Sequence, residues 1–441
     1  MRYRKGWVTL AILAMVIAAC GGSDGATDTT SGETTTTAQQ TTTTLSETTT
    51  TVAAGSLEGV ELKLWGWSSS DAENQALADL VAEFNAETGA LAEFQPQAEY
   101  DATLQAALAG GEPPDVFYVD SFKLPDLASE GVLAPIPDGA VDAPSDIYPS
   151  LREAFTFDGT WYCPPKDFST LALIYDPSVL EAAGVDVPTN WEELRAAAEA
   201  LTTGPIEEIA AGNAQAGLAM GVEYPRWGVF LFQAGVALTD DEVTMVTLDN
   251  DEARQALQYV SDLYLDGYAV KPQAVDAGWA GEAFGQGKAA MTIEGNWIVG
   301  YLQDTFPDKE FAVAELPVGP AGPGTFAFTV CYGVPANAPN PDASWALVNF
   351  LTNPEGSLAW TSAFNVMPAR ISVAEDWLAP RPELAAFLDG AEYARRWGFK
   401  PGVNDLVGVF NEMAEGLIVG DVTVDDLIAE VVDAGESILG G

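Results

Sequence analysis

Apolar and polar positions along the chain predict strands and helices that follow one another. Residues 60–64 carry apolar side chains at every second position, as a strand with one buried face does. Leu77, Leu80, Val81 and Phe84 then recur at helical spacing. The same patterns predict further strands at 116–119, 171–175, 289–293 and 326–334, and helices at 191–201, 251–265, 344–351 and from 405 onward, with a break at Gly420. This alternation predicts an α/β fold in which helices cover the faces of a sheet.

Residues 1–19 have the pattern of a signal peptide. Basic residues near the start precede an apolar run, residues 8–19, that is too short to span a bilayer. The segment 17–20, Ile-Ala-Ala-Cys, resembles the lipobox of bacterial lipoproteins. That resemblance implies cleavage before Cys20 and a lipid on its thiol. The alternative is an ordinary secretion signal followed by an incidental cysteine.

Residues 20–56 are rich in threonine and hold almost nothing that a core could bury, so we expect a disordered tether after the lipidated cysteine. Folded sequence begins near Leu57. The remaining length is more than one hydrophobic core usually holds, which predicts two domains.

The formal net charge of −47 excludes some partners. Such a chain repels nucleic acid and anionic lipid, so we expect no nucleic-acid partner and membrane attachment through the lipid alone. Cys163 and Cys331 are an even pair in an exported chain once Cys20 is lipidated, which favours a disulfide. The alternative is two separate buried thiols.

The composition also limits the chemistry. The chain has no histidine, which excludes Ser-His-Asp and Cys-His catalysis and every histidine metal site, and we expect no metal and no cofactor. A carboxylate pair, as in a glycoside hydrolase, is the enzymatic alternative that remains. A structural adhesin would suit the threonine-rich stalk, but adhesins are usually repetitive or all-β, and this chain is neither.

Five segments together resemble the family 1 extracellular solute-binding proteins, the group that includes maltose-binding protein. They are residues 60–65, Val-Glu-Leu-Lys-Leu-Trp; 114–120, Pro-Asp-Val-Phe-Tyr-Val-Asp, leading into 127–133; 165–176, from Pro-Lys-Asp-Phe to Leu-Ile-Tyr-Asp; 294–297, Glu-Gly-Asn-Trp; and 420–426, Gly-Asp-Val-Thr-Val-Asp-Asp. Each segment is weak alone, and their order and spacing carry the resemblance, which covers nearly everything from Leu57 onward.

The resemblance implies a two-lobed periplasmic-binding-protein fold with a ligand cleft between lobes that hinge strands join. It places residues 57–166 and 335–382 in the N-terminal lobe, and residues 167–333 and 383–441 in the C-terminal lobe. The crossings then fall near Asp167 and Gly333. Cys163 and Cys331 lie just before these points, on strands that are neighbours in the family, which gives the disulfide a geometric reason.

A saccharide offers hydroxyl groups and an apolar C–H face, so its site needs aromatic rings and carboxylates or amides. The resemblance and the predicted strand ends give these candidate ligand-binding residues: Trp67, Ser69, Tyr100, Asp120, Asp167, Trp227, Asn296, Trp297 and Arg370. Each has a structural alternative: core packing for the tryptophans, helix capping for Ser69 and Asp120, an ion pair with Lys166 for Asp167, a turn for Asn296, and the surface for Tyr100 and Arg370. Trp191, Trp345 and Trp360 lie on predicted helices, where core packing is the better interpretation.

The expected protein is a monomeric binding lipoprotein outside the cytoplasmic membrane that delivers a mono- or oligosaccharide to the permease subunits of an ABC importer. A polyol or glycerol phosphate is the alternative ligand, although basic residues are scarce. Ser69 and Ser70 stand where maltose-binding protein has an acid and a lysine, which argues against maltodextrin.

Overall fold

The computed structural model of the protein describes residues 57–68, 71–240, 243–395 and 400–440. The predicted signal peptide, Cys20, the threonine-rich segment and Ser69 lie outside these residues. Among the described helices, none combines the length and the apolar character that crossing a membrane requires.

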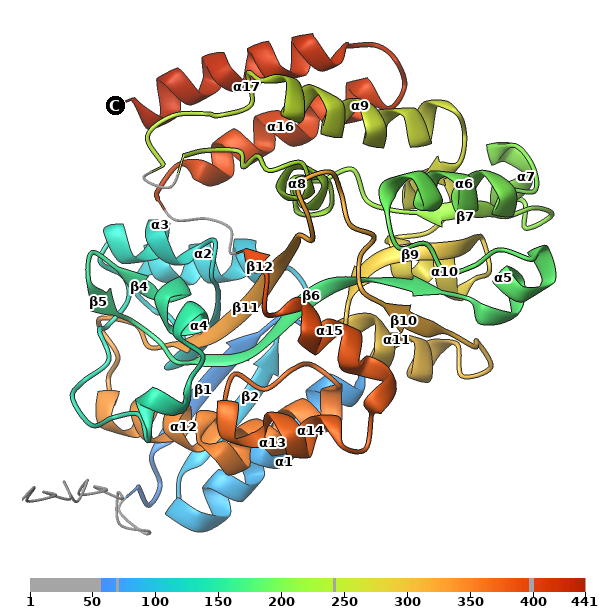
Figure 1. Ribbon diagram of the computed structural model, residues 1–441. Helices are drawn as coiled ribbons and strands as arrows, with labels where there is room; N and C mark the ends of the chain where they lie inside the picture. Colours follow the sequence, from blue (N-terminus) through green and yellow to red (C-terminus); the bar gives the residue numbers. More distant parts are fainter. Residues whose placement is uncertain (1–56, 69–70, 241–242, 396–399, 441) are drawn as a thin grey trace, which may run out of the picture. The chain divides into compact units, whose positions relative to one another are not determined.

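Strands that lie far apart in sequence form a ten-stranded sheet with the path β2-β1-β3-β11-β6-β9-β7-β8 (Figure 1). The strands of this path are β1 (Glu61–Gly66), β2 (Leu91–Pro96), β3 (Val116–Asp120), β6 (Pro165–Tyr175), β7 (Ala216–Ala219), β8 (Ala269–Val270), β9 (Ala289–Gly295) and β11 (Thr325–Gly333). Two more strands, β10 (Ala312–Ala314) and β12 (Ala394–Arg395), pair with β6 and β11. A separate two-stranded sheet joins β4 (Thr156–Phe157) and β5 (Thr160–Trp161).

The sheet divides into two parallel groups at its ends. The group β2-β1-β3 belongs to the first lobe, and the group β9-β7-β8 belongs to the second. Between them, β11 and β6 are antiparallel to each other and cross from one lobe to the other. Because β3 and β9 are both antiparallel to the crossing strand beside them, their carboxyl ends point toward the boundary between the lobes. Ligands of α/β sheets bind beyond such ends.

Helices cover both faces of this sheet. The longer helices are α1 (Asp71–Thr88), α2 (Tyr100–Gly110), α6 (Trp191–Leu201), α8 (Tyr224–Gln233), α9 (Asp251–Leu265), α11 (Trp297–Thr305), α12 (Pro341–Thr352), α13 (Pro354–Phe364), α16 (Val403–Leu417) and α17 (Val424–Leu439). Shorter helices include α3 (Leu124–Ser129), α4 (Pro149–Ala154), α5 (Pro177–Ala183), α7 (Ile206–Ala210), α10 (Ala280–Gly285), α14 (Ala374–Leu378) and α15 (Ala385–Gly390).

Separate hydrophobic clusters support the two lobes. One contains Leu62, Leu64 and Val116–Val119 together with residues of α1, α12 and α13. Another contains Leu171 and Leu173 together with residues of α6, α8, α9, α16 and α17. A third, which includes Phe168, Ala172 and Ile174, underlies α11, α14 and α15. Two large cores joined by two crossing strands are the arrangement that permits hinge motion between lobes.

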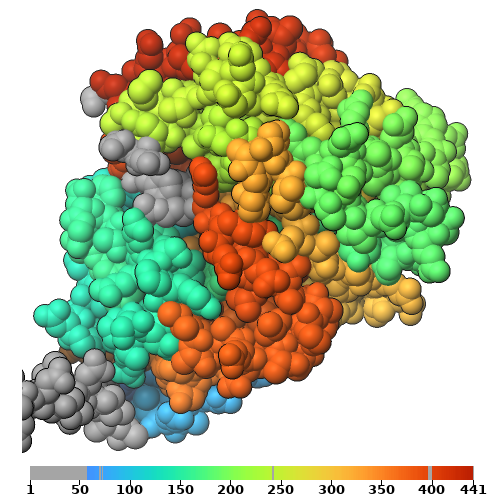
Figure 2. Space-filling model, viewed as in Figure 1, coloured from blue at the N-terminus to red at the C-terminus, as the bar shows by residue number. Residues whose placement is uncertain are grey.

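One face of the crossing strands is covered by α15. Thr170 Oγ1 in β6 donates a hydrogen bond to the carbonyl of Phe387 at 2.6 Å. Figure 1 shows α15 in front of β6, and Figure 2 shows the surface of the same side, where α15 and its neighbours pack between residues of both lobes. The candidate site described below lies on the opposite face.

Candidate functional site between the lobes

Two predicted carboxylates share one face of the sheet where the strands cross. Asp120, the last residue of β3, pairs with Val330 of β11, and Asp167 of β6 pairs with the same Val330 from the other side. Directly opposed residues of neighbouring strands point to the same face. The sheet register therefore brings Asp120 and Asp167 to one face, within one strand of each other.

Trp67 adds an aromatic wall beside these carboxylates. It follows β1 and stays half-buried, with its ring packed edge-on against Tyr118 at a centroid distance of 4.9 Å. Tyr118 precedes Asp120 by two positions and so lies on the same face of β3. Trp67 is thus close to the end of β3.

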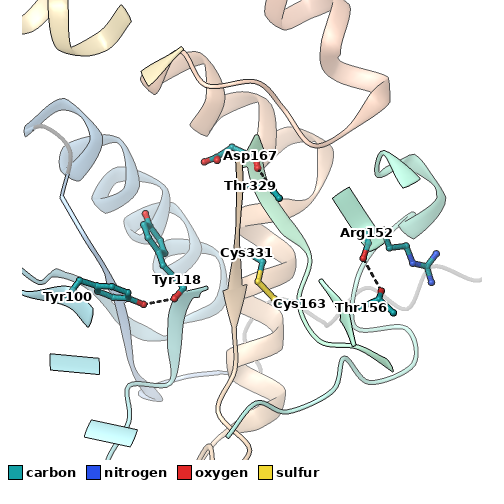
Figure 3. The surroundings of a disulfide bond; sticks show 8 residues. All are labelled: Tyr100, Tyr118, Arg152, Thr156, Cys163, Asp167, Thr329 and Cys331. Carbon is teal, nitrogen blue, oxygen red and sulfur yellow. Dashed lines mark hydrogen bonds between the residues drawn. A yellow bond between two sulfur atoms is a disulfide. The ribbon is translucent and has the colours of Figure 1, made fainter. Parts of the chain in front are cut away.

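Tyr100 was predicted to bind the ligand, but the structure gives it a supporting role. It is buried, and its hydroxyl donates a hydrogen bond to the Tyr118 carbonyl at 2.5 Å, as Figure 3 shows. Its ring supports Trp67 edge-on at 5.4 Å. Tyr100 therefore packs against Trp67 and supports it, and the Tyr100 hydroxyl is already hydrogen-bonded and not free to bind a ligand.

Asp167 forms a buried ion pair with Lys166, which was the structural alternative to a ligand-binding role. Lys166 Nζ lies 2.6 Å from Asp167 Oδ2, and both side chains are almost completely buried. Trp360 Nε1 donates a second hydrogen bond to the same carboxylate oxygen at 2.8 Å. The Lys166 ammonium also lies over the Trp360 and Tyr118 rings, at 4.1 and 4.6 Å from their centroids. Asp167 is thus part of the floor of the site, with its charge already compensated.

Asp120 differs from Asp167 because its carboxylate has no hydrogen bond or ion pair with the described part of the chain. It is half-buried at the end of its strand. Burial raises the pKa of Asp120 to about 7; Asp101 and Asp167 add to the rise, and Lys123 and Lys166 oppose it. A carboxylate in this state needs donors, and a ligand can supply them.

The raised pKa predicts that Asp120→Asn stabilises the ligand-free protein at alkaline pH. The folded state binds a proton at Asp120 up to about pH 7, whereas an unfolded aspartate loses it near about pH 4. The contribution of Asp120 to stability is therefore fully present below about pH 4 and falls as the pH rises through 7. We expect Asp120→Asn to raise the free energy of unfolding by about 1–3 kcal/mol at pH 8 and to change it little near pH 4.

Urea denaturation at both pH values measures this difference. The exposed Asp308 provides the matched control, Asp308→Asn, because replacing a side chain that lies in water should change the free energy of unfolding little. A gain for Asp120→Asn that is equal at both pH values would contradict the titration.

The second lobe presents Trp297 at the end of β9. Trp297 opens α11, is half-buried, and packs against hydrophobic clusters of both lobes. Its Nε1 donates to Glu294 Oε2 at 3.1 Å, and its ring meets Phe328 of β11 edge-on at 5.3 Å. Phe328 precedes Val330 by two positions, so Trp297 lies on the same face as Asp120 and Asp167.

A buried ion pair sits beneath Trp297. Arg226 Nη2 lies 2.6 Å from Glu294 Oε2, and the guanidinium lies 5.6 Å from the Trp297 ring. Burial alone would lower the pKa of Arg226, but Glu294 and Glu223 hold it above its ordinary value, so the guanidinium stays charged. Burial raises the pKa of Glu294, and Arg226 opposes that rise.

A cavity of about 320 Å³ opens beside this ion pair. It lies at the carboxyl ends of β7, β8 and β9, and it has acids, bases, an amide and an aromatic ring in its walls. These are Glu223, Arg226, Lys271, Trp279, Glu294, Asn411 and Glu415. Polar groups that converge on an aromatic ring in a cavity of this size are typical of a small-molecule site.

Trp227 was also predicted to bind the ligand, but it is fully buried in the core of the second lobe. Its ring lies near parallel to Tyr264 at a centroid distance of 6.0 Å and edge-on to Phe410 at 6.4 Å. Every residue of α8 except Arg226 is buried. The helix therefore turns Arg226 toward the cavity and its neighbour Trp227 toward the core.

Asn296 and Arg370 also have structural roles. Asn296 is completely buried, and its Nδ2 donates to the carbonyl of Asn365 at the end of α13 at 3.1 Å. Arg370 is also buried, and it donates to the carbonyls of Thr352, Asp142 and Ala143 at 2.7–2.9 Å. These hydrogen bonds give both side chains structural roles, and Arg370 is not a surface residue.

A disulfide joins Cys163 and Cys331 beside the crossing strands (Figure 3). The two Cα atoms are 5.7 Å apart, and both residues are completely buried. Cys331 pairs with Val119 of β3 and Pro165 of β6, so the bridge lies on the first-lobe side of Asp167. It ties the two crossing strands together at their first-lobe end.

A larger cavity, of about 790 Å³, lies on the other side of the crossing strands. It is lined by Phe168, Ala327 and Thr329, whose side chains alternate to the face opposite Asp167 and Val330. It receives none of the predicted ligand residues. The described residues also hold no group of three or more side chains that could bind a metal ion.

Arg226, Glu294 and Trp279 are site residues that the sequence predictions missed. Glu294 belongs to a segment already singled out, and a carboxylate at the end of a buried strand was a usable signal. For Arg226, the usable signal was the scarcity of basic residues: the chain has 18 Lys and Arg against 65 Asp and Glu, so each basic residue stands out. Nothing in the local sequence placed Trp279 in the site, because a distant helix, α16, completes the cavity.

Known proteins resemble this chain in sequence. The family model described as bacterial extracellular solute-binding protein matches residues 79–386. A protein of Brucella abortus, named only as a binding protein, is 23% identical over 419 residues, which is 88% of this chain and 98% of the relative. The maltotriose-binding protein of Pyrococcus abyssi is 24% identical over 269 residues, 59% of this chain and 56% of the relative.

Solved structures share the fold. The GacH receptor of Streptomyces glaucescens, solved unliganded and with acarbose, has a TM-score of 0.76 and 26% identity and covers 87% of this chain and 99% of its own. A Listeria monocytogenes ABC substrate-binding protein in complex with cycloalternan has a TM-score of 0.78 at 22% identity, over 87% of this chain and 100% of its own. These neighbours are two-lobed sugar-binding proteins, which agrees with the two-lobed α/β fold predicted from the sequence.

Proposed function

This chain belongs to the bacterial extracellular solute-binding proteins, and from that premise we propose that it binds a saccharide between its lobes for an ABC importer. The observation that carries the proposal is the convergence of Trp67 and Asp120 from the first lobe with Trp297 from the second on one face of the crossing strands. Aromatic rings stack on the C–H faces of sugars, and carboxylates accept their hydroxyl protons.

The named ligands of the relatives support a saccharide over other solutes. Maltotriose, acarbose and cycloalternan appear in the names of proteins that resemble this chain. A glycerol phosphate is a poorer candidate, because Arg226 and Lys271 in the second-lobe cavity already pair with Glu294 and Glu415. A phosphate would have to displace these carboxylates.

The location proposed for the protein follows from its first residues. Cys20 would carry the lipid on the outer side of the cytoplasmic membrane, and residues 21–56 would let the folded part reach the permease subunits. Growth of cells in radiolabelled palmitate, followed by isolation of the protein, tests the anchor. Wild-type protein should carry label and Cys20→Ala should not.

A thermal-shift screen over mono- and oligosaccharides tests the proposed function. A ligand at a hundred times its dissociation constant stabilises the folded state by about 2.7 kcal/mol, so the cognate saccharide should raise the melting temperature clearly. Chromatography of the same mixtures should return the saccharide unchanged. Hydrolysis of an oligosaccharide would favour the glycoside hydrolase alternative.

Trp297→Ala should weaken the binding of that saccharide by about 1–3 kcal/mol, because it removes a stacking platform and a contact to both lobes. Calorimetric titration measures the loss, and circular dichroism checks that the variant folds. The buried Trp345 of α12 offers the control Trp345→Phe, which should leave affinity unchanged. Unchanged affinity in Trp297→Ala would remove Trp297 from the site.

A further inference from the structure

Each cation in the walls of the proposed site is already paired with a carboxylate of the protein. The pairs within the described residues are Lys123 with Asp101, Lys166 with Asp167, Arg226 with Glu294, and Lys271 with Glu415. Arg226 also lies 3.3 Å from a second carboxylate, Glu223. The described residues therefore supply no spare positive charge to the site.

Asp120 takes part in none of these ion pairs. It lies at the end of β3, half-buried, and its carboxylate has no hydrogen bond or ion pair with any described residue. Lys123, three residues later, pairs with Asp101 on α2, and Lys166 pairs with Asp167 on β6. The strand end thus presents one carboxylate that no described residue partners.

An aromatic wall stands beside this carboxylate. Trp67 packs on Tyr118, which shares a face of β3 with Asp120. The sheet register thus places an aromatic ring and an unpaired carboxylate at the same end of the first lobe, the combination that recognises an ammonium group, because the ring face and the anion both attract positive charge.

From this juxtaposition we propose that Asp120 selects a saccharide carrying a basic nitrogen, an amino sugar or an amine-bearing pseudosaccharide, over its neutral counterpart. The inference rests on the proposed function, because it names the ligand class of the same site. The protonated nitrogen lies against Asp120 and Trp67, while Trp297 stacks on a ring from the second lobe.

Binding of such a ligand is coupled to a proton. Among the described residues, the charged groups that act on Asp120 are Lys123, Asp101 on α2, and Lys166 and Asp167 on β6, and the charge of Asp120 also acts on Tyr100 of α2. Without ligand, burial raises the pKa of Asp120 to about 7. An ammonium group beside the carboxylate lowers that pKa, so binding near neutral pH releases a proton from Asp120.

The experiment uses matched saccharides that differ at one nitrogen. Calorimetric titrations near neutral pH compare glucosamine and its β-1,4 trimer with their N-acetylated forms and with glucose and cellotriose, in wild type and Asp120→Asn. We expect wild type to bind the free amine at least about tenfold more tightly than the acetylated or neutral form, as a charge-assisted bond implies. In Asp120→Asn that preference should fall to within about threefold.

A second readout does not depend on a variant. Titrations of wild type in two buffers of different ionisation enthalpy should show release of a proton with the free amine, and less with the acetylated form. Equal affinity for the amine and its neutral forms, or a preference that survives in Asp120→Asn, would overturn this inference while leaving saccharide binding intact. Failure of every saccharide in the thermal-shift screen would instead overturn the proposed function, and this inference with it.

Discussion

Replacing Lys166 by Met should lower the free energy of unfolding by about 3–5 kcal/mol, because the change leaves Asp167 as a buried charge with no cation beside it. The Lys166 and Asp167 side chains are 4% and 9% exposed, so solvent cannot take the place of the ammonium group. The Trp360 indole would remain as a donor, but one neutral hydrogen bond does not replace an ion pair. Methionine keeps most of the volume, so the effect reports charge rather than a cavity.

Lys271→Met provides the control. Lys271 pairs with Glu415 at a similar distance, 2.7 Å, but these side chains are 30% and 50% exposed. Exposed pairs contribute about 0–1 kcal/mol, so this variant should be nearly as stable as wild type. Urea denaturation of both variants gives the comparison. Equal and small losses would show that Asp167 becomes protonated or hydrated when Lys166 is removed.

Removal of the disulfide is the second large effect. A bridge that closes a loop of 168 residues restricts the unfolded chain, and the entropic model assigns such a loop about 5 kcal/mol. We expect the double variant Cys163→Ala, Cys331→Ala to lose about this much stability. Each single variant breaks the same bridge, so each should lose about as much as the double variant.

Non-additivity distinguishes a bridge from two separate thiols. If Cys163 and Cys331 were unbridged, the two single losses would add up to the double loss. Mass measurement of denatured, alkylated protein that begins after Cys20 provides an independent check. Wild type should gain no alkyl group until it is reduced; two alkyl groups without reduction would contradict the bridge.

The sequence patterns predicted most of the elements but not every boundary. The expected helix 251–265 coincides with α9, and the break at Gly420 falls between α16 and α17. The helix expected from 191 is capped by the Asn190 side chain, and Thr189 donates a hydrogen bond to the Glu193 carboxylate. The strand expected at 171–175 begins six residues earlier, because β6 crosses between lobes and is buried on both faces, where no alternation marks its start.

Side-chain direction was the harder part of the site. Asp120 ends one strand and Trp297 follows another, so the sheet register decides which way each side chain faces. The family resemblance, rather than any local pattern, implied that register. Trp227 lies on a helix that is buried on every side except at Arg226, so no polar face of that helix shows from the sequence which way Trp227 points. Arg370 reaches backbone carbonyls more than two hundred residues away in sequence, a contact that no local pattern encodes.

We propose that this protein captures a saccharide between its lobes and releases it unchanged. Calorimetric titration of the folded part with the saccharide that gives the largest thermal shift tests it most directly. We expect saturation at one ligand per chain, recovery of the saccharide intact, and weaker binding in Trp297→Ala. Consumption of the saccharide, or the absence of a saturable heat with every saccharide, would contradict it.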